Sequence, residues 1–200
     1  MSESMDALAS ALFQKRVPAP WAMWPSRRAL PSWLDDLGRR IGQLDEWTQQ
    51  MTLPPVTWLA GFINPQSFLT AICQVSARSN ELELDKLTTY TDVLSELRDD
   101  MSEPSAHGAY IDGLFLQGAR WDVDSCQIEK ALPKEMFCPM RVIDVRAMLA
   151  ENVGTAGVYL CPTYKTVQRG PDFVFCAQLR SKSPPARWVL AGVALVLDSE

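Results

Sequence analysis

The stretch GAYIDGLFLQGARWD, residues 108–122, decides between helix and strand for the second half of the chain. Its residues 110–116 follow a period near two, which is typical of a strand with one buried face. Gln117 and Gly118 then predict a turn that returns the chain into a second strand at residues 120–123. The sequence around this stretch therefore predicts a sheet and not a further helix.

Downstream of this stretch, four more apolar segments read as short strands. They are residues 142–145, 158–161, 173–179 and 188–197, and the last is apolar on both faces, as in a central strand. No segment of helical length and period separates them, which argues against parallel β-α-β units. We expect a small antiparallel β-barrel of about six strands.

Upstream, the apolar period is near 3.6 residues and predicts three helices. The second helix is expected to begin after an N-cap at Ser32 and the third after Asn64-Pro65. The first two helices carry apolar stripes, which are Met5, Leu8, Leu12 and Phe13 and then Leu34, Leu37, Ile41, Leu44, Trp47 and Met51. The third helix is expected to bury Phe68, Leu69, Ile72 and Val75. Helices followed by strands indicate an α+β fold, with a helical subdomain at 1–88 and a barrel subdomain at 89–200.

Composition excludes several classes of function. The chain has 200 residues and a formal net charge of −5, without the basic stripe that nucleic acid or an acidic membrane requires. Its five cysteines are odd in number and include no C-x-x-C pair, which favours reduced thiols over disulfides or zinc. No apolar run is long enough to span a bilayer, and no signal peptide is visible, so we expect a soluble cytosolic protein.

The sequence also lacks recognisable catalytic machinery. The only histidine, His107, has no G-x-S-x-G nucleophile motif to serve, and no Gly-Lys dipeptide exists for a phosphate-binding loop. The neighbouring carboxylates Asp35-Asp36 and Asp99-Asp100 would point in different directions on a helix or lie in a polar loop. We therefore predict no enzyme activity, no catalytic or metal-binding residue and no cofactor in this segment.

Seven tryptophans are many for this length. Trp47, Trp121 and Trp188 fall on the predicted helix stripe or strands, where core packing explains them. Trp21 and Trp24 lie instead in a linker of Pro, Trp and Arg outside any stripe. An exposed aromatic side chain needs a covering surface, so these two residues are the candidate interface.

Several blocks, in this order, resemble the C-terminal domain of dynein heavy chains. The two most specific are residues 108–122 and the block CPTYKT at residues 161–166. The others are WLAGF at 58–62, PQSFLT at 65–70, QVSAR at 74–78, PK at 133–134, PMRVI at 139–143, FV at 173–174 and WVLAGVAL at 188–195. The forms GARWD and CPTYKT are more similar to axonemal heavy chains than to cytoplasmic ones.

The resemblance implies a place in a motor. Dynein heavy chains are microtubule motors built on a ring of ATP-hydrolysing AAA+ modules, and their C-terminal domain lies across one face of that ring. It carries helices and then a small β-barrel, tunes the motor and holds no nucleotide site. The implied partners are the AAA+ ring of the same heavy chain and, indirectly, the dynein complex and microtubules. From the unassigned aromatics and the helical stripes, we expect Trp21, Trp24 and the outer face of the first helices to dock on that ring. The implied location is the cytoskeleton, in the axoneme of a cilium or flagellum.

Two departures from the family keep other interpretations open. The loop after CPTYKT, residues 167–172, is shorter than usual, and the ring itself is absent, as in a fragment, a truncated gene product or a designed piece. One alternative is a stand-alone interaction module that retains this fold without the motor. Another is a ligand-binding barrel, which an interior closed by Phe115, Phe173, Phe175 and Trp188 would exclude.

Overall fold

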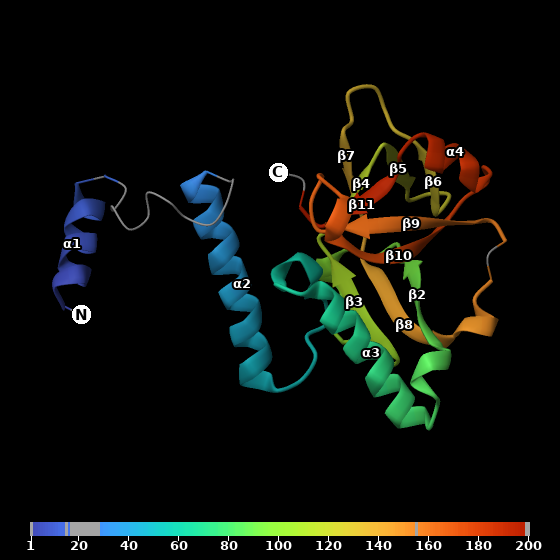
Figure 1. Cartoon of the computed structure of the whole chain (residues 1–200), viewed down its shortest axis with the longest axis horizontal. Coiled ribbons are helices and arrows are strands. Elements are labelled where there is room, and N and C mark those ends of the chain that lie inside the picture. Colours follow the sequence, from blue (N-terminus) through green and yellow to red (C-terminus); the bar gives the residue numbers. More distant parts are fainter. Residues whose placement is uncertain (1, 15, 17–28, 155, 199–200) are drawn as a thin grey trace. The chain divides into compact units, whose positions relative to one another are not determined.

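The computed structural model of the protein describes residues 2–14, 16, 29–154 and 156–198. Two compact units emerge, Met1–Arg39 and Arg40–Glu200, and each is described by itself. The first contains helix α1 (Ser2–Phe13) and the beginning of α2 (Leu30–Gln50), and the second contains the remaining described elements (Figure 1). The predicted division at residue 88 stays a prediction.

The three predicted N-terminal helices are present, with one corrected start. Helix α2 begins at Leu30 and not after an N-cap at Ser32. Pro31 is tolerated there because the first turn of a helix has N–H groups without intrahelical partners. In α1, the predicted stripe leaves Met5 and Phe13 exposed among the described residues.

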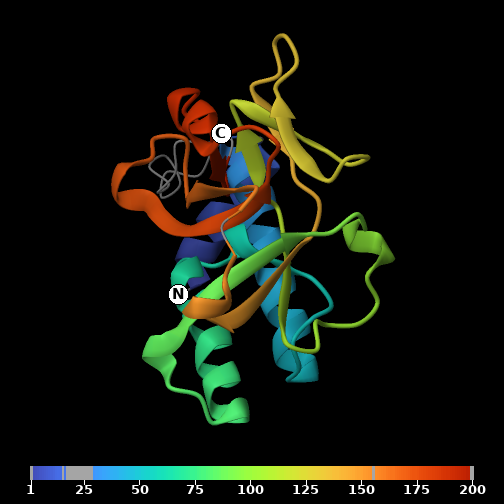
Figure 2. The ribbon, with the colours of Figure 1, turned by 90° about the vertical axis from the view of Figure 1, so that its right-hand side faces the viewer.

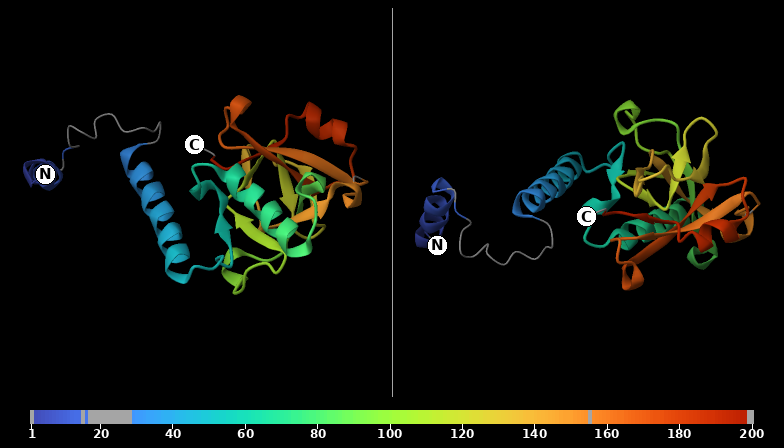
Figure 3. Two further views of the ribbon diagram at one scale, coloured as in Figure 1. Left: turned by 60° about the horizontal axis from the view of Figure 1, so that its bottom comes forward. Right: turned by 90° about the horizontal axis from the view of Figure 1, so that it is seen from above.

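Helix α3 (Pro65–Asn80) begins as the sequence predicts. The Asn64 side chain accepts a hydrogen bond from the Ser67 backbone N–H, and proline occupies the first turn. The helix buries Leu69 and Ile72 against the neighbouring sheet, but Val75 is exposed, so the predicted buried face is wrong at that position. Figure 3 shows α3 lying along the strands, and its contacts place it against β8 and β2.

Three sheets account for the strands of the described residues. One has the order β1-β3-β8-β2, the second β10-β9-β11-β4-β7, and a hairpin pairs β5 with β6. The bounds are β1 Thr57–Trp58, β2 Leu87–Val93, β3 Gly108–Asp112, β4 Phe115–Gln117, β5 Ala119–Asp122, β6 Gln127–Lys130, β7 Phe137–Pro139, β8 Ile143–Leu149, β9 Val158–Tyr164, β10 Phe173–Arg180 and β11 Ala194–Val196. Short 3-10 turns lie at Leu59–Gly61, Leu84–Lys86, Arg98–Asp100, Ala150–Asn152 and Gly170–Asp172.

The single strand predicted at residues 110–116 is in fact two strands. Gly113 has φ +79°, a conformation that glycine adopts without a side-chain clash, and it separates β3 from β4. The backbone passes there from the four-stranded sheet to the five-stranded sheet. This bend joins the two larger sheets. Elsewhere, the loop between β6 and β7, in yellow in Figure 2, extends away from both sheets.

The α+β class is confirmed, whereas the predicted closed, wholly antiparallel barrel is not. Two strand pairs, β1 with β3 and β9 with β11, are parallel. Over the described residues there are eleven strands instead of about six, and no backbone ladder pairs β2 with β10. The Gln178 side chain bridges those two edges instead: its Oε1 accepts from Thr91 N–H and from Thr91 Oγ1, both at 2.8 Å.

The C-terminal apolar run is a second correction. Residues 188–190 belong to a short helix, α4 (Pro185–Leu190), and only Ala194–Val196 form a strand. Pro185 at the first helical position fits a helix start, and Trp188 donates from Nε1 to Ser181 Oγ at 2.7 Å. Periodicity cannot separate a buried helix from a buried strand in so short an apolar run.

The core lies between the two larger sheets and α3. Its fully buried side chains include Leu59, Ile111, Leu116, Ile143 and Leu195, and Trp121 and Trp188 are buried as predicted. Among the helices of the described residues, none has the length and apolarity needed to cross a membrane.

Candidate functional site

The predicted interface residues Trp21 and Trp24 lie outside the described residues, so their role stays a prediction. The described surface nearest to them in sequence is helix α2. Its segment from Arg40 onward belongs to the second unit and can be followed residue by residue.

One side of this helix segment is joined to the sheet by Gln43. The Trp58 backbone N–H donates to Gln43 Oε1 at 2.7 Å, and Gln43 Nε2 donates to the Trp58 carbonyl at 3.1 Å. The amide thus pairs with both backbone groups of one β1 residue, as a neighbouring strand would. We call this pair of hydrogen bonds the Gln43 clamp.

The surroundings of the clamp leave little room for movement. A Cβ on Gly61 would lie 2.6 Å from Gln43 Nε2, and a Cβ on Gly113 would overlap the Trp58 indole. The Arg40 guanidinium lies over the same indole, 5.2 Å from the ring centroid. Two glycines therefore allow the close approach of the Gln43 and Trp58 side chains to the backbone.

One turn further along α2, Trp47 enters an aromatic cluster. Its ring is edge-on to Phe62 at 5.7 Å and to Phe68 at 5.9 Å, and these two rings stack at 5.0 Å. Such pairs add to the stabilisation that burial provides. Arg40, Gln43 and Trp47 are spaced by three and four residues, so one face of the helix makes all of these contacts.

Apart from Trp47, the predicted apolar stripe of α2 is exposed. Ile41 is 55% exposed and Leu44 49%, and Met51, just after the helix, is 84% exposed. Leu34 and Leu37, in the first unit, are exposed as well. Trp47, which was expected to pack in the core, is half-buried.

No sequence motif pointed to the clamp. Gln43 breaks no pattern and belongs to no motif, and it forms its hydrogen bonds with a strand of only two residues. Gly61 and Gly113 both lie against Trp58 and leave room for its side chain. The sequence shows these two glycines but not that they approach Trp58, because that approach depends on the fold.

Polar side chains near the only histidine do not form a catalytic triad. Ser105 Oγ donates to Asp144 Oδ1 at 3.1 Å, and Arg146 pairs with the other oxygen of that carboxylate at 2.9 Å. A nucleophilic serine would instead donate to the imidazole. Burial raises the pKa of Asp144, and Arg146, Ser105 and His107 act in the opposite direction.

Burial makes three of the cysteines poor nucleophiles, and one of the paired carboxylates caps a local turn. All five cysteines are free, and burial raises the pKa of Cys73, Cys161 and Cys176, which disfavours the reactive thiolate. Asp100 accepts a hydrogen bond from the Leu97 N–H within its own 3-10 turn. Within the described residues, no three His, Cys, Asp or Glu side chains gather as metal ligands.

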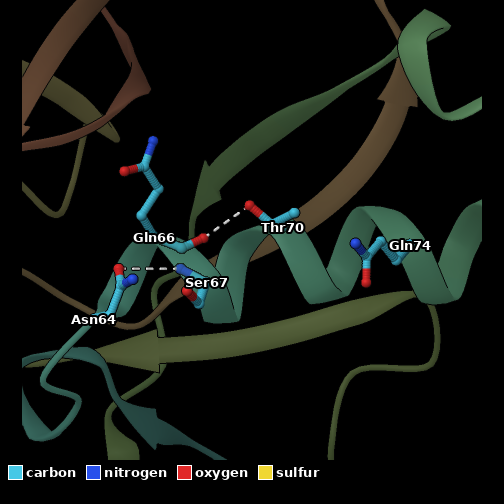
Figure 4. A pocket seen from close by; sticks show the side chains of 5 residues that line it. All are labelled: Asn64, Gln66, Ser67, Thr70 and Gln74. Atoms are coloured by element: carbon cyan, nitrogen blue, oxygen red, sulfur yellow. Dashed lines mark hydrogen bonds between the residues drawn. The ribbon is translucent and has the colours of Figure 1, made fainter.

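Two pockets over the described residues lie open to solvent. One, of about 390 Å³, is lined by polar residues at and near the start of α3: Asn64, Gln66, Ser67, Thr70 and Gln74 (Figure 4). Thr70 and Asn64 use their hydrogen-bonding atoms within the helix, on Gln66 O and Ser67 N. Of the residues expected to close a barrel interior, Phe175 and Trp188 are buried, Phe115 is half-buried and Phe173 is 45% exposed.

Comparison with known proteins decides the family. The family model that describes the C-terminal domain of the dynein heavy chain matches residues 1–197. This protein belongs to the dynein heavy chain family, as its C-terminal domain. The predicted resemblance, covering nearly the whole sequence, is thereby confirmed.

The relatives are axonemal, as the sequence motifs predicted. The chain is 46% identical over 200 residues to the ciliary dynein beta chain of Tripneustes gratilla. It is 44% identical to dynein axonemal heavy chain 9 of Homo sapiens and 46% to the flagellar outer arm dynein beta chain of Chlamydomonas reinhardtii. Each match covers 99% of this chain but only 4% of the relative, so the chain spans a small part of these heavy chains.

Proposed function

We propose that this chain is the non-catalytic regulatory and structural domain at the C-terminus of an axonemal dynein heavy chain. In this role it packs on the AAA+ ring of the same polypeptide and contributes to microtubule-based movement. The observation that carries the proposal is the match of residues 1–197 to the C-terminal domain, within relatives that are about 25 times longer, since the chain spans 4% of each.

The chemistry of the described residues is in keeping with a non-catalytic role. Ser105 and Arg146 both pair with Asp144, and burial raises the pKa values of Cys73, Cys161 and Cys176. We propose no cofactor and no metal in this segment. ATP hydrolysis then belongs to the ring, and the proposed partners are that ring, the dynein complex and, indirectly, microtubules in the axoneme of a cilium or flagellum.

The ring-docking role of Trp21 and Trp24 can be tested in an axonemal heavy chain that has this domain. We expect the double variant Trp21→Ala, Trp24→Ala to change gliding speed and microtubule-stimulated ATPase, because the loss of two aromatic anchors weakens docking. Gln168→Ala, at an exposed position of the second unit, is the control. Unchanged speed and ATPase in the double variant would show that these tryptophans do not dock the domain.

A test of the whole proposal is deletion of the domain from the same heavy chain. We expect the shortened motor to retain ATP hydrolysis, because the catalytic modules remain, but to lose its normal stepping speed. A deletion without effect on speed or ATPase would contradict a regulatory role. Hydrolysis of ATP by the purified 200-residue protein would contradict the proposed absence of catalysis.

A further inference from the structure

We propose that Ser183 is a phosphorylation site for a proline-directed protein kinase, and that Arg187 receives the phosphate. In this reaction Ser183 Oγ bonds to the γ-phosphorus of ATP, the bond from that phosphorus to the β-phosphate oxygen breaks, and ADP leaves. The hydroxyl proton passes to the carboxylate base of the kinase. The inference goes beyond the proposed function, because it concerns a modification of this chain and not its place in the motor.

The sequence around Ser183 suits a proline-directed kinase. Ser183 is the only serine or threonine in the chain that a proline follows, and kinases of this class require that proline. Pro184 has φ −62° and ψ 143°, the extended backbone in which a kinase binds its substrate. From residue 173 to residue 197 the sequence has three basic residues and no acidic one. A phosphate on Ser183 therefore meets no like charge within this segment.

The Ser183 hydroxyl is available, unlike that of its neighbour Ser181. Both residues beside Ser183 are exposed, and Ser183 itself is half-buried. Among the hydrogen bonds of the described residues, the Ser183 hydroxyl takes part in one, as acceptor from Arg187 Nη1 at 3.0 Å. Ser181 is 8% exposed, and its hydroxyl accepts from Trp188 Nε1 at 2.7 Å. Modification of Ser183 therefore spares the core, whereas modification of Ser181 would disrupt it.

Arg187 is already in place to receive a phosphate. Its Nη1 donates to the neutral Ser183 hydroxyl, and its guanidinium lies over the buried Trp188 ring, 5.1 Å from the centroid. A phosphoserine carries a charge of about −2 at neutral pH and several acceptor oxygens, so each bond from Arg187 becomes charge-assisted. A guanidinium also suits phosphate better than an ammonium group does, because its planar fork can donate in a bidentate manner. The Arg187 side chain therefore forms a receptor for a phosphate on Ser183.

The expected consequence is a tighter hold on α4. The helix has six residues, too few to be stable on its own, and Arg187 is the third of them. A charge-assisted bond from Arg187 to a phosphate on Ser183 ties the helix more strongly to the residue before its N-cap. The Ala191 N–H donates to the Arg187 carbonyl at 3.1 Å and reports on this end of the helix. We expect its hydrogen exchange to slow roughly two- to fivefold on phosphorylation.

The first experiment tests the phosphate acceptor. The purified, folded 200-residue protein is incubated with ATP and a proline-directed kinase of the mitogen-activated class, and phosphorylated residues are mapped by tandem mass spectrometry. We expect phosphate on Ser183, and none at this position in Ser183→Ala or in Pro184→Ala, which keeps the hydroxyl but removes the proline. Ser102→Ala, at an exposed serine in the loop before β3, is the control and should be modified like the wild type.

The outcomes of this experiment decide the site. A folded protein without phosphate on Ser183 would overturn the proposal, and so would modification only after unfolding in urea, because the fold would then hide the hydroxyl. Phosphate on Ser183 in the Pro184→Ala variant would overturn the class of kinase. None of these failures touches the proposed function, because deletion of the domain tests that function separately.

The second experiment tests Arg187 as the receptor. The modified protein is titrated by phosphorus NMR, since the second pKa of phosphoserine is ordinarily about 6. A guanidinium bonded to the phosphate favours the dianion, so this pKa should be lower by about half a unit in the wild type and should return in Arg187→Gln. Arg78→Gln, at an exposed arginine on α3, is the control. Equal pKa values in the wild type and Arg187→Gln, or unchanged exchange at Ala191, would show that Arg187 does not receive the phosphate.

Discussion

At the scale of single residues, a few side chains determine where the strands bend and how the sheets stay joined. Gly113 allows the bend between β3 and β4, and the Trp58 indole fills the space where its side chain would be. The sequence showed a glycine within an apolar stretch, which is compatible with either a continuous strand or a bend. Only the contact with Trp58, distant in the sequence, distinguishes the two.

The bend predicts the effect of adding one methyl group. We expect Gly113→Ala to lower the free energy of unfolding by roughly 2–4 kcal/mol, because it combines a left-handed conformation with overlap against Trp58. Urea unfolding of the whole protein measures this. Gly154→Ala, where nothing lies within 4 Å of the added Cβ, should stay within about 0.5 kcal/mol of the wild type. Equal effects at both positions would contradict the overlap with Trp58.

A second prediction concerns Tyr159 in the core. Its hydroxyl donates to the Val193 carbonyl at 2.8 Å, and burial raises its pKa to about 12, with Cys161 acting in the same direction. Because the folded-state pKa exceeds the ordinary value near 10, this tyrosine's contribution is fully present below about pH 10 and is lost as pH rises toward 12.

We therefore expect two effects of Tyr159→Phe. At about pH 8 the variant should unfold with about 1–2 kcal/mol less free energy, because the Val193 carbonyl loses its partner. Between about pH 10 and about pH 12 the stability difference between wild type and variant should narrow. Urea titrations across this range measure both effects, and a difference that widens with pH would contradict the raised pKa.

At the scale of elements, helices α2 and α3 and strands β8, β9 and β10 were predictable, and the apolar run at 188–197 was not. The start of α3 followed from Asn64-Pro65, since the cap and the proline act locally. The sequence predicts a single strand at residues 188–197, because a short, continuously apolar run has no period that separates a helix from a strand. The existence of α2 was also predictable, but the face that it buries was not, because contacts with β1 and not apolarity decide it.

The edge between β2 and β10 carries a prediction at this scale. Gln178 makes four hydrogen bonds to Thr91 and Thr89, and Arg180 pairs with Asp92 at 3.0 Å beside them. The Gln178→Ala variant should lose its three side-chain bonds and destabilise the protein by roughly 2–4 kcal/mol. Amide hydrogen exchange should accelerate in β2 and β10 more than in β9. Gln168→Ala should leave exchange unchanged, and uniform acceleration would show that Gln178 supports the core generally and not this edge.

At the scale of the whole molecule, the family was predictable from the sequence because of two long blocks, 108–122 and 161–166. Both blocks lie where the fold restricts the backbone and the choice of residue. The first block spans the bend between the two larger sheets. The second block forms the C-terminal part of β9 and the turn after it. Strand order was not predictable, since pairing of β9 with β11 and of β1 with β3 depends on contacts between distant segments. A closed barrel stays a prediction.

The central claim is that this domain works as one end of a heavy chain, and the size of the native polypeptide tests it most directly. An antibody raised against residues 40–198 should detect, on an immunoblot, a band far above 22.4 kDa that is enriched in cilia or flagella. That result is the one predicted here. A band at 22.4 kDa would contradict the claim and identify a stand-alone protein that retains this fold without the motor.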